Sequence, residues 1–352
     1  MNGADLIPGP ESLQVPGLVF KVLLILTFVL HLILMNIALG GSILNAAYRL
    51  RKKDAITASS NLPTTIALAV NLGVPPLLFV QVLFGQFFYT SSVLMAAYWL
   101  AVVPILILAY YAAYIMQRKG KPASGAFWSA VSAFLLLCIA FIYVNNMSLM
   151  LRYERWPGYF ADKRGLMLDL GDPSLFPRFF HFVVGALAVA SLSWSAWARF
   201  RELRGKGSDE GAKKTGLRLF WIFTSLEMVV GLAWLGTLPR ETMRLFIGGS
   251  AYATTLLALG VLMAIGLLAH AVMGKFRIAA IILAPTVVVM VLMRDVIRTS
   301  ALSKVFSESA MKVEPQYGPM ALFLAAFAVG IGVLAWMVRT GLKADKAAGG
   351  SN

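Results

Sequence analysis

Long apolar stretches separated by short polar segments run through this chain from end to end. A helix that crosses the hydrocarbon core of a bilayer needs about 20 mostly apolar residues. Nine stretches come close to or reach that length, and no segment between them is long enough to fold alone. The pattern predicts an all-α membrane protein, a single polytopic domain over residues 1–352 with about nine transmembrane helices, roughly at residues 17–41, 64–88, 93–116, 124–146, 178–198, 217–238, 247–273, 278–293 and 319–338.

The distribution of basic residues predicts how these helices are oriented. If the N-terminus lies outside, 19 of the 31 Lys and Arg residues fall in inside segments. The other 12 fall in outside segments, where acidic residues partly offset their charge. Cytoplasmic loops carry an excess of Lys and Arg, so we expect the N-terminus outside and the C-terminus in the cytoplasm. The inside positions gather at residues 49–53, 118–121, 199–218, 275–277 and 339–346.

Composition supports the membrane class and excludes other classes. Only 13% of the residues are charged, whereas soluble proteins have about 25%, and the mean hydropathy is +0.77. The net charge of +15 sits in short loops between spans, where topology explains it, so we expect lipid and no nucleic acid as the partner. The single cysteine, Cys138, excludes an internal disulfide and a thiolate metal cluster.

Four titratable residues lie within the apolar stretches: His31, His181, His270 and Glu227. Such residues are rare in membrane spans and are often functional. An imidazole there is either a hydrogen-bonded structural group or a ligand, as in haem proteins. At 1.5 Å per residue, His181 lies near the outer surface and His31 just inside the midplane, so they would serve two haems rather than one iron. Gly185, one turn after His181, would leave room beside its imidazole.

Two further regions carry candidate residues. Pro75 and Pro76 should kink or break the second span, and the freed carbonyls would then face protein or a cavity. The part of this span that follows the two prolines carries the polar residues Gln81, Gln86 and Tyr89. It would form either the wall of a cavity for a cofactor or quinone, or an ordinary aromatic belt at the membrane surface.

At the outer end of the eighth span, Arg294 and Arg298 are one turn apart, with Asp295 beside them. Paired arginines at a membrane surface suit anionic groups such as haem propionates, or else lipid headgroups. Met290 and Met293 precede them and are either soft axial ligands or packing residues.

Four segments in the first half of the chain resemble subunit I of the cytochrome bd quinol oxidases. They are Val29–Gly40 around the first histidine, Asn71–Val74 with Phe84–Ser91 in the second span, Val144–Asn146, and Arg178–His181. The resemblance covers residues 17–200, the first five spans, in the same order and orientation. Residues 217–338, the last four spans, are less similar. The resemblance implies a multi-pass protein of the bacterial cytoplasmic (inner) membrane.

The resemblance also implies roles for particular residues. His181 would be the axial ligand of a low-spin b haem near the outer surface, and His31 an axial ligand at a second, inner haem site. Arg294 would be comparable to the arginine of the family's Gly-Arg-Gln-Pro-Trp segment, although that segment itself is absent here. The family pairs this subunit with a second membrane subunit. In the outer loop, a docking surface for such a partner would include Arg152, Arg155, Trp156 and Tyr159.

Several functions are consistent with these observations. The leading one is a b-type haem electron-transfer subunit with one or two haems, passing electrons between the quinone pool and a c-type cytochrome or other redox partner. His270 could join His31 as a ligand of the second haem, and Glu227 could handle quinone protons. A terminal quinol oxidase is the enzyme alternative, although the family's glutamates after the second span have no counterpart here. A cofactor-free proton-coupled transporter and a membrane anchor subunit remain open.

Overall fold

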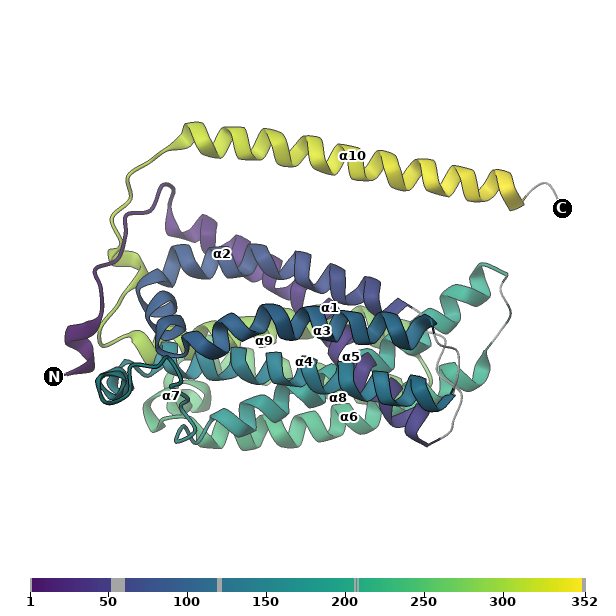
Figure 1. Ribbon diagram of the computed structural model, residues 1–352, viewed down its shortest axis with the longest axis horizontal. Helices are drawn as coiled ribbons and strands as arrows, with labels where there is room; N and C mark the ends of the chain where they lie inside the picture. The colour runs from purple at the N-terminus through teal and green to yellow at the C-terminus, as the bar shows by residue number, and fades with distance from the viewer. Residues whose placement is uncertain (1, 52–60, 119–121, 206, 208, 350–352) are drawn as a thin grey trace.

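The computed structural model describes residues 2–51, 61–118, 122–205, 207 and 209–349 (Figure 1). Within these residues there is no strand, and nine helices are long and apolar enough to cross a membrane. The all-α class and the nine spans are therefore confirmed. The nine helices are α1 (Gly17–Leu50), α2 (Leu62–Leu94), α3 (Ala96–Arg118), α4 (Pro122–Leu151), α5 (Leu175–Leu203), α6 (Glu210–Thr237), α8 (Ala251–Val272), α9 (Phe276–Leu302) and α10 (Tyr317–Gly349).

The long helices run along one common direction, and the two termini lie at opposite ends of the molecule (Figure 1). The C-terminal end of α1 and the connection between α5 and α6 lie at the same end as the C-terminus, so these basic clusters gather there. The basic residues Lys52, Lys53, Lys119, Lys121 and Lys206, which the orientation argument also uses, lie outside the described residues.

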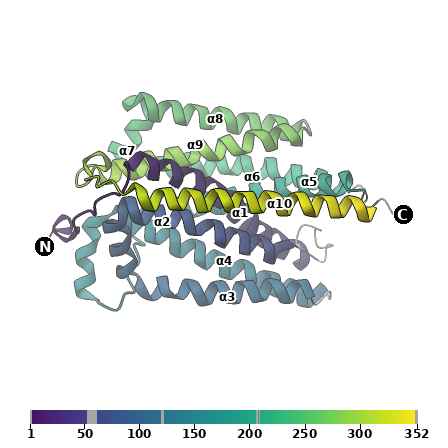
Figure 2. The same ribbon diagram turned by 90° about the horizontal axis from the view of Figure 1, so that it is seen from above.

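The first eight spanning helices form a bundle, with α1 and the α5–α6 pair between two flanks. Seen from above, α3 and α4 lie on one flank and α8 and α9 on the other (Figure 2). α1 packs against α2, α4, α5 and α9. Its Gly40 faces the backbone of Ala186 on α5 so closely that any side chain would collide. A small residue at a crossing lets two membrane helices approach closely.

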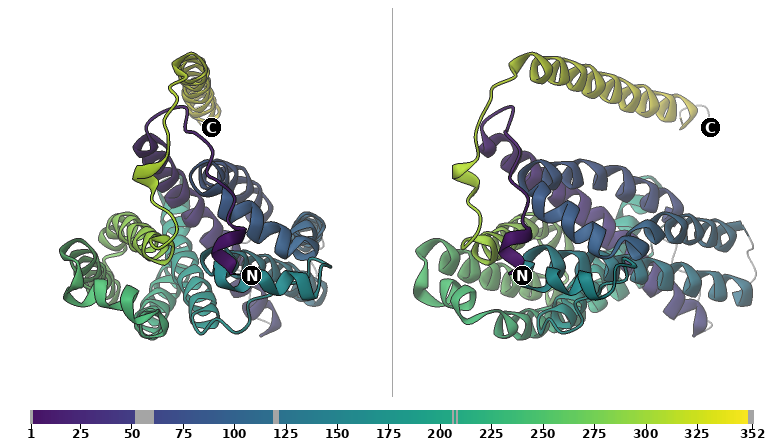
Figure 3. Two further views of the ribbon diagram at one scale, coloured as in Figure 1. Left: turned by 90° about the vertical axis from the view of Figure 1, so that its left-hand side faces the viewer. Right: turned by 60° about the vertical axis from the view of Figure 1, so that its left-hand side comes forward.

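α5 is the most enclosed of the spans. Half of the residues in its most apolar 18-residue stretch are buried, whereas the corresponding share is 28% or less for each of the other described spanning helices. α10 is the opposite case, because none of its corresponding stretch is buried and it stands apart from the bundle (Figure 3). The chain before α1 pairs with the segment before α10, where the Leu13 amide donates to the Lys312 carbonyl at 2.8 Å.

The sequence predicts a kink or a break at Pro75 and Pro76, and the structure shows no break there. α2 continues through both prolines, and the non-helical residue is Phe84, with φ −134° and ψ 29°. A membrane helix can keep its course at proline because neighbouring helices enclose the freed backbone groups. The distortion lies two turns later, at Phe84. The ring of Phe84 is buried, with the Phe306 ring packed against it and the Arg298 guanidinium above its face.

The connection between α4 and α5, where the sequence predicts a docking surface, folds partly onto the bundle. Trp156 is fully buried, and its indole N–H donates to the Leu149 carbonyl at 2.8 Å. Arg152 and Arg155 both pair with the buried Asp169, at 2.9 and 3.5 Å. Trp156 is therefore unavailable to a partner, which corrects the sequence expectation. An indole buries a large apolar area once its N–H is satisfied, so it favours the interior.

A buried ion pair joins this loop to α5. Arg178 donates to Asp172 at 2.8 Å and to the Ser148 hydroxyl at 2.7 Å, and Ser148 in turn donates to Asp172 at 2.7 Å. Burial alone would raise the pKa of Asp172, but the hydrogen bond from Ser148, the Arg178 charge and the Ser174 amide together lower it below its ordinary value. A lowered folded-state pKa means that the ionised carboxylate stabilises the fold.

We predict that Asp172→Asn destabilises the protein at pH 7 by about 3–5 kcal/mol, because it leaves the Arg178 charge buried without its partner. The contribution of Asp172 is fully present above its unfolded-state pKa of about 3.9 and is lost as pH falls through the lower folded-state value. The difference between wild type and variant should shrink accordingly in thermal unfolding measured at decreasing pH. Asp162→Asn, which breaks an exposed pair with Arg164, is the control and should change little. Equal stability of Asp172→Asn and wild type at pH 7 would contradict the prediction.

Candidate functional site

Two adjacent cavities lie inside the bundle, and each is lined by one histidine. The His181 cavity has a volume of about 320 Å³, and helices α1, α5, α6, α8 and α9 supply most of its wall. The His31 cavity has about 360 Å³ and is walled mainly by α1, α2 and α4. Both volumes fall in the range of small-molecule and cofactor sites, about 300–1,000 Å³. The two cavities share the side chains of Phe28, Leu32, Phe182, Trp234, Arg294 and Ile297.

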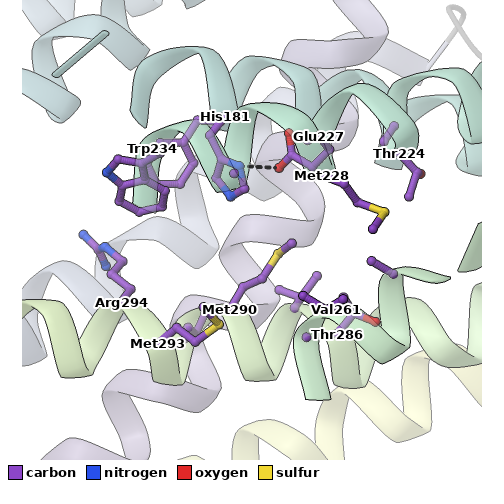
Figure 4. Close-up of a pocket in the computed structure, with 18 of the residues that line it drawn as sticks. His181, Thr224, Glu227, Met228, Trp234, Val261, Thr286, Met290, Met293 and Arg294 are labelled. Atoms are coloured by element: carbon purple, nitrogen blue, oxygen red, sulfur yellow. Dashed lines mark ion pairs between the residues drawn. The ribbon is translucent and has the colours of Figure 1, made fainter. Parts of the chain in front are cut away.

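In the His181 cavity, the imidazole from α5 lies beside the carboxylate of Glu227 from α6 (Figure 4). Nδ1 of His181 is 3.1 Å from Oε1 of Glu227. The direction of the ring N–H is not aligned for a hydrogen bond, so Nδ1 has no hydrogen-bond partner among the described residues. With Nδ1 next to the carboxylate, Nε2 is the ring nitrogen left for a ligand.

The surroundings of the imidazole differ from the sequence expectation. A Cβ on Gly185 would lie 2.9 Å from Oε1 of Glu227, so the room at Gly185 is taken by the carboxylate. The room beside the ring is provided by Gly231 instead, whose Cβ would lie 3.2 Å from Cε1 of His181. The indole of Trp234 packs near the imidazole, with ring centroids 5.2 Å apart. Glu227, Gly231 and Trp234 are spaced four and three residues apart, so one face of α6 surrounds the histidine.

The facing wall of the His181 cavity comes from α9. Met290, Met293 and Arg294 lie across from His181 and Glu227 (Figure 4). These positions follow one another at helical spacing, which places them along one side of α9. The wall is otherwise apolar, yet several buried polar atoms that line it have no hydrogen-bond partner among the described residues: Asn36 Oδ1, His181 Nδ1, Thr224 Oγ1, Glu227 Oε2 and Trp234 Nε1. Buried polar groups in this state are typical of a ligand site.

In the His31 cavity, the imidazole is tied to α2. Nδ1 of His31 lies 2.9 Å from the Ala69 carbonyl oxygen, which can only accept, so Nδ1 carries the proton. Nε2 is then again the nitrogen with a free lone pair. A metal-binding histidine commonly donates its other N–H to a carbonyl or carboxylate in this way. Gly73 makes the close approach possible, because a Cβ there would lie 2.9 Å from Cε1 of the ring.

Three arginines line the His31 cavity: Arg178, Arg294 and Arg298. The sequence places Arg294 and Arg298 at the outer end of the eighth span; in the structure α9 continues to Leu302, and the Arg298 side chain is 5% exposed. Arg298 is ion-paired with Asp295 and stacks over a phenylalanine ring. These contacts let it stay inside the protein.

Arg294 lines both cavities, with its guanidinium carbon 4.4 Å from the centre of the Phe28 ring. Among the described residues, it makes no ion pair with a carboxylate. A guanidinium in that position is suited to an anionic group of a bound molecule. α5 begins and α9 ends at the same end of the bundle, so all three arginines lie toward that end.

Other residues singled out in the sequence lie away from both cavities. His270 lines neither, and its Nδ1 bonds to the Gly266 carbonyl at 2.8 Å one turn back on α8. Gln81, Gln86 and Tyr89 also line neither, and the Tyr89 hydroxyl reaches Gln81 at 3.4 Å on the exposed side of α2. The part of α2 that does wall the His31 cavity is the stretch from Ile66 to Val80, together with Phe88.

Sequence reasoning missed Trp234, Gly231 and the burial of Arg178. Trp234 could have been found, because it stands seven residues from Glu227 and therefore on the same face of α6. In the sequence, Arg178 stands out only as the first residue of the segment Arg178–His181, and nothing local to it indicates burial. Its inward position depends on Asp172, which lies in the preceding loop.

No protein-family model, no curated protein and no solved structure matches this chain. The likeness of residues 17–200 to subunit I of the cytochrome bd oxidases stays a prediction.

We predict that Gly73→Ala destabilises the protein by about 1–3 kcal/mol, because the new methyl group forces the tethered His31 ring or α2 to shift. Gly41→Ala on α1 is the matched control, since nothing lies within 4 Å of its added Cβ. Helix propensity should leave the control unchanged or more stable by up to about 1 kcal/mol. Thermal unfolding of the purified variants in detergent compares the two. If Gly73→Ala behaved like the control, the close contact at His31 would be ruled out.

Proposed function

We propose that this protein is a membrane electron-transfer subunit that binds two b-type haems, one in each cavity. It would pass electrons between the quinone pool and a partner redox protein in a bacterial cytoplasmic membrane. The observation that carries the proposal is the pair of adjacent cavities, each with one imidazole whose Nδ1 faces an oxygen: Nδ1 of His31 bonds to the Ala69 carbonyl at 2.9 Å, and Nδ1 of His181 lies 3.1 Å from the Glu227 carboxylate. The resemblance to subunit I of the bd oxidases points to the same two histidines.

The residues present fit haem as the bound group. One neutral imidazole per cavity is a common axial donor set for haem iron, and Met290 or Met293 offers a soft second donor across the His181 cavity. Gly231 and Gly73 let α6 and α2 approach the two imidazoles closely, because a Cβ at either position would crowd the ring. Apolar side chains form most of both walls, as a porphyrin face requires. Arg294 supplies a cation without a carboxylate partner between the cavities, suited to propionates.

A bound haem would supply a one-electron iron couple at each site. The chain's own contribution is to hold the two sites next to each other and keep water away. Trp234 and Phe28 belong to both cavity walls, so the two bound groups would be separated by little more than one layer of side chains. The reduction potentials would depend on the ligands, on burial and on nearby charges.

A second membrane subunit or a c-type cytochrome is the expected partner, and quinone the expected small-molecule substrate. Reduction of oxygen, as in a terminal quinol oxidase, is a separate activity that the same purified protein would reveal by consuming oxygen with quinol. In this proposal the N-terminus lies outside the membrane and the basic end of the bundle lies in the cytoplasm.

We predict that the purified protein gives a b-type reduced-minus-oxidised spectrum and two haems per chain by pyridine haemochrome. His181→Ala and His31→Ala should each lose about half of the haem, because each removes the imidazole of one cavity. His270→Ala is the control and should keep both haems, since His270 lines neither cavity. Circular dichroism would verify that each variant is folded.

A featureless spectrum in well-folded wild-type protein would exclude the haem proposal. The buried pair of Glu227 and His181 would then favour the cofactor-free alternative, proton-coupled transport, which can be measured in proteoliposomes.

A further inference from the structure

We infer that Glu227 is a positioning residue for the His181 imidazole, and that its carboxylate lowers the reduction potential of the group bound at this histidine. The inference rests on the proposed function, in which Nε2 of His181 binds haem iron. In this inference Glu227 changes the reduction potential of the group at His181 and leaves that of the group at His31 unchanged. The other histidine, His31, is held by a neutral carbonyl instead.

The first step is the geometry. Oε1 of Glu227 lies 3.1 Å from Nδ1 of His181, and no other described residue hydrogen-bonds to that nitrogen. A small rotation of either side chain would align the N–H with the carboxylate. A carboxylate can only accept, so this arrangement places the proton on Nδ1 and leaves the lone pair on Nε2.

The second step is that the pair is confined. Gly185 packs against the carboxylate, with its Cβ position 2.9 Å from Oε1, and Gly231 packs against the ring at 3.2 Å. Trp234 lies on another side of the ring. Glu227 and His181 are both buried within the α5–α6 contact. The two side chains therefore have little freedom to separate, and the carboxylate orients the ring.

The third step is the effect of the charge. A carboxylate behind an imidazole makes the ring a stronger donor, and mutating such outer partners typically costs 10–100-fold in metal affinity or activity. The surrounding wall is mostly apolar, so the charge of an ionised Glu227 would be poorly screened. That charge would stabilise the more positive, oxidised state of the bound group and thus lower its potential. A carbonyl dipole, such as that of Ala69 at His31, exerts a weaker effect.

The test is Glu227→Gln, which keeps the size and removes the charge. Redox titration of the purified full-length protein, followed by visible spectra at a single pH, should show two midpoint potentials. In the variant only one of them should rise, by about 59 mV, which is a tenfold change in the one-electron reduction equilibrium constant. The electron paramagnetic resonance signal of the same ferric site should shift as well.

Ser225→Ala is the control. Ser225 lies two residues before Glu227 on α6 and lines neither cavity, and its hydroxyl donates to the Trp221 carbonyl on the exposed side of the helix. Both potentials should stay at their wild-type values in this variant. The His31 site serves as an internal control within every sample.

The outcomes separate the inference from the proposed function. Glu227→Gln protein that keeps both haems with unchanged potentials would overturn the inference and leave the proposed function standing. If Glu227→Gln fails to fold or loses haem, Glu227→Asp, which draws the carboxylate back from Nδ1, decides: an upward shift of one potential supports the inference, and unchanged potentials overturn it. Wild-type protein without haem would overturn both.

Discussion

A polar side chain inside a membrane bundle must find its partner within the protein, because lipid offers none. This constraint organises the structure. His31 on α1 bonds to the α2 backbone, His181 on α5 lies beside Glu227 on α6, and Arg178 pairs with Asp172 ahead of α5. Lys21 on α1 pairs with Asp295 on α9 at 2.9 Å. Each contact joins separate segments of the chain, so the few polar groups specify how a mostly apolar bundle is assembled.

The same contacts position the two cavities. Glycines bring helices close where an imidazole or carboxylate must be reached: Gly73 at His31, Gly231 at His181 and Gly185 at Glu227. Larger side chains such as Phe28 and Trp234 form the wall that the cavities share. Packing and candidate chemistry therefore use the same residues, and an electron-transfer function would follow from the closeness of two sites built around α1, α5, α6 and α9.

Much of the candidate site could be predicted from residue type alone. His31 and His181 stood out as rare titratable groups, and their different depths agree with their separate cavities. Arg294 and Met293 were singled out and do line the His181 cavity. The pairing of Glu227 with His181 could not be predicted, because 46 positions separate them and each could have faced any neighbour. Nor could the burial of Trp156 be predicted, since it depends on the shape of the core beneath the connection between α4 and α5.

By itself, the sequence determined the number of spanning helices and their order, because about 20 apolar residues in lipid have to satisfy their backbone as a helix whatever their neighbours are. Only the tertiary structure decided the rotation of each helix about its axis, and with it which polar groups meet. α2 stays helical at Pro75, α9 carries Arg298 into the interior, and α6 turns Glu227, Gly231 and Trp234 toward His181. Rotation depends on how side chains of several helices fit together, and hydrophobicity along one chain carries little information about that fit.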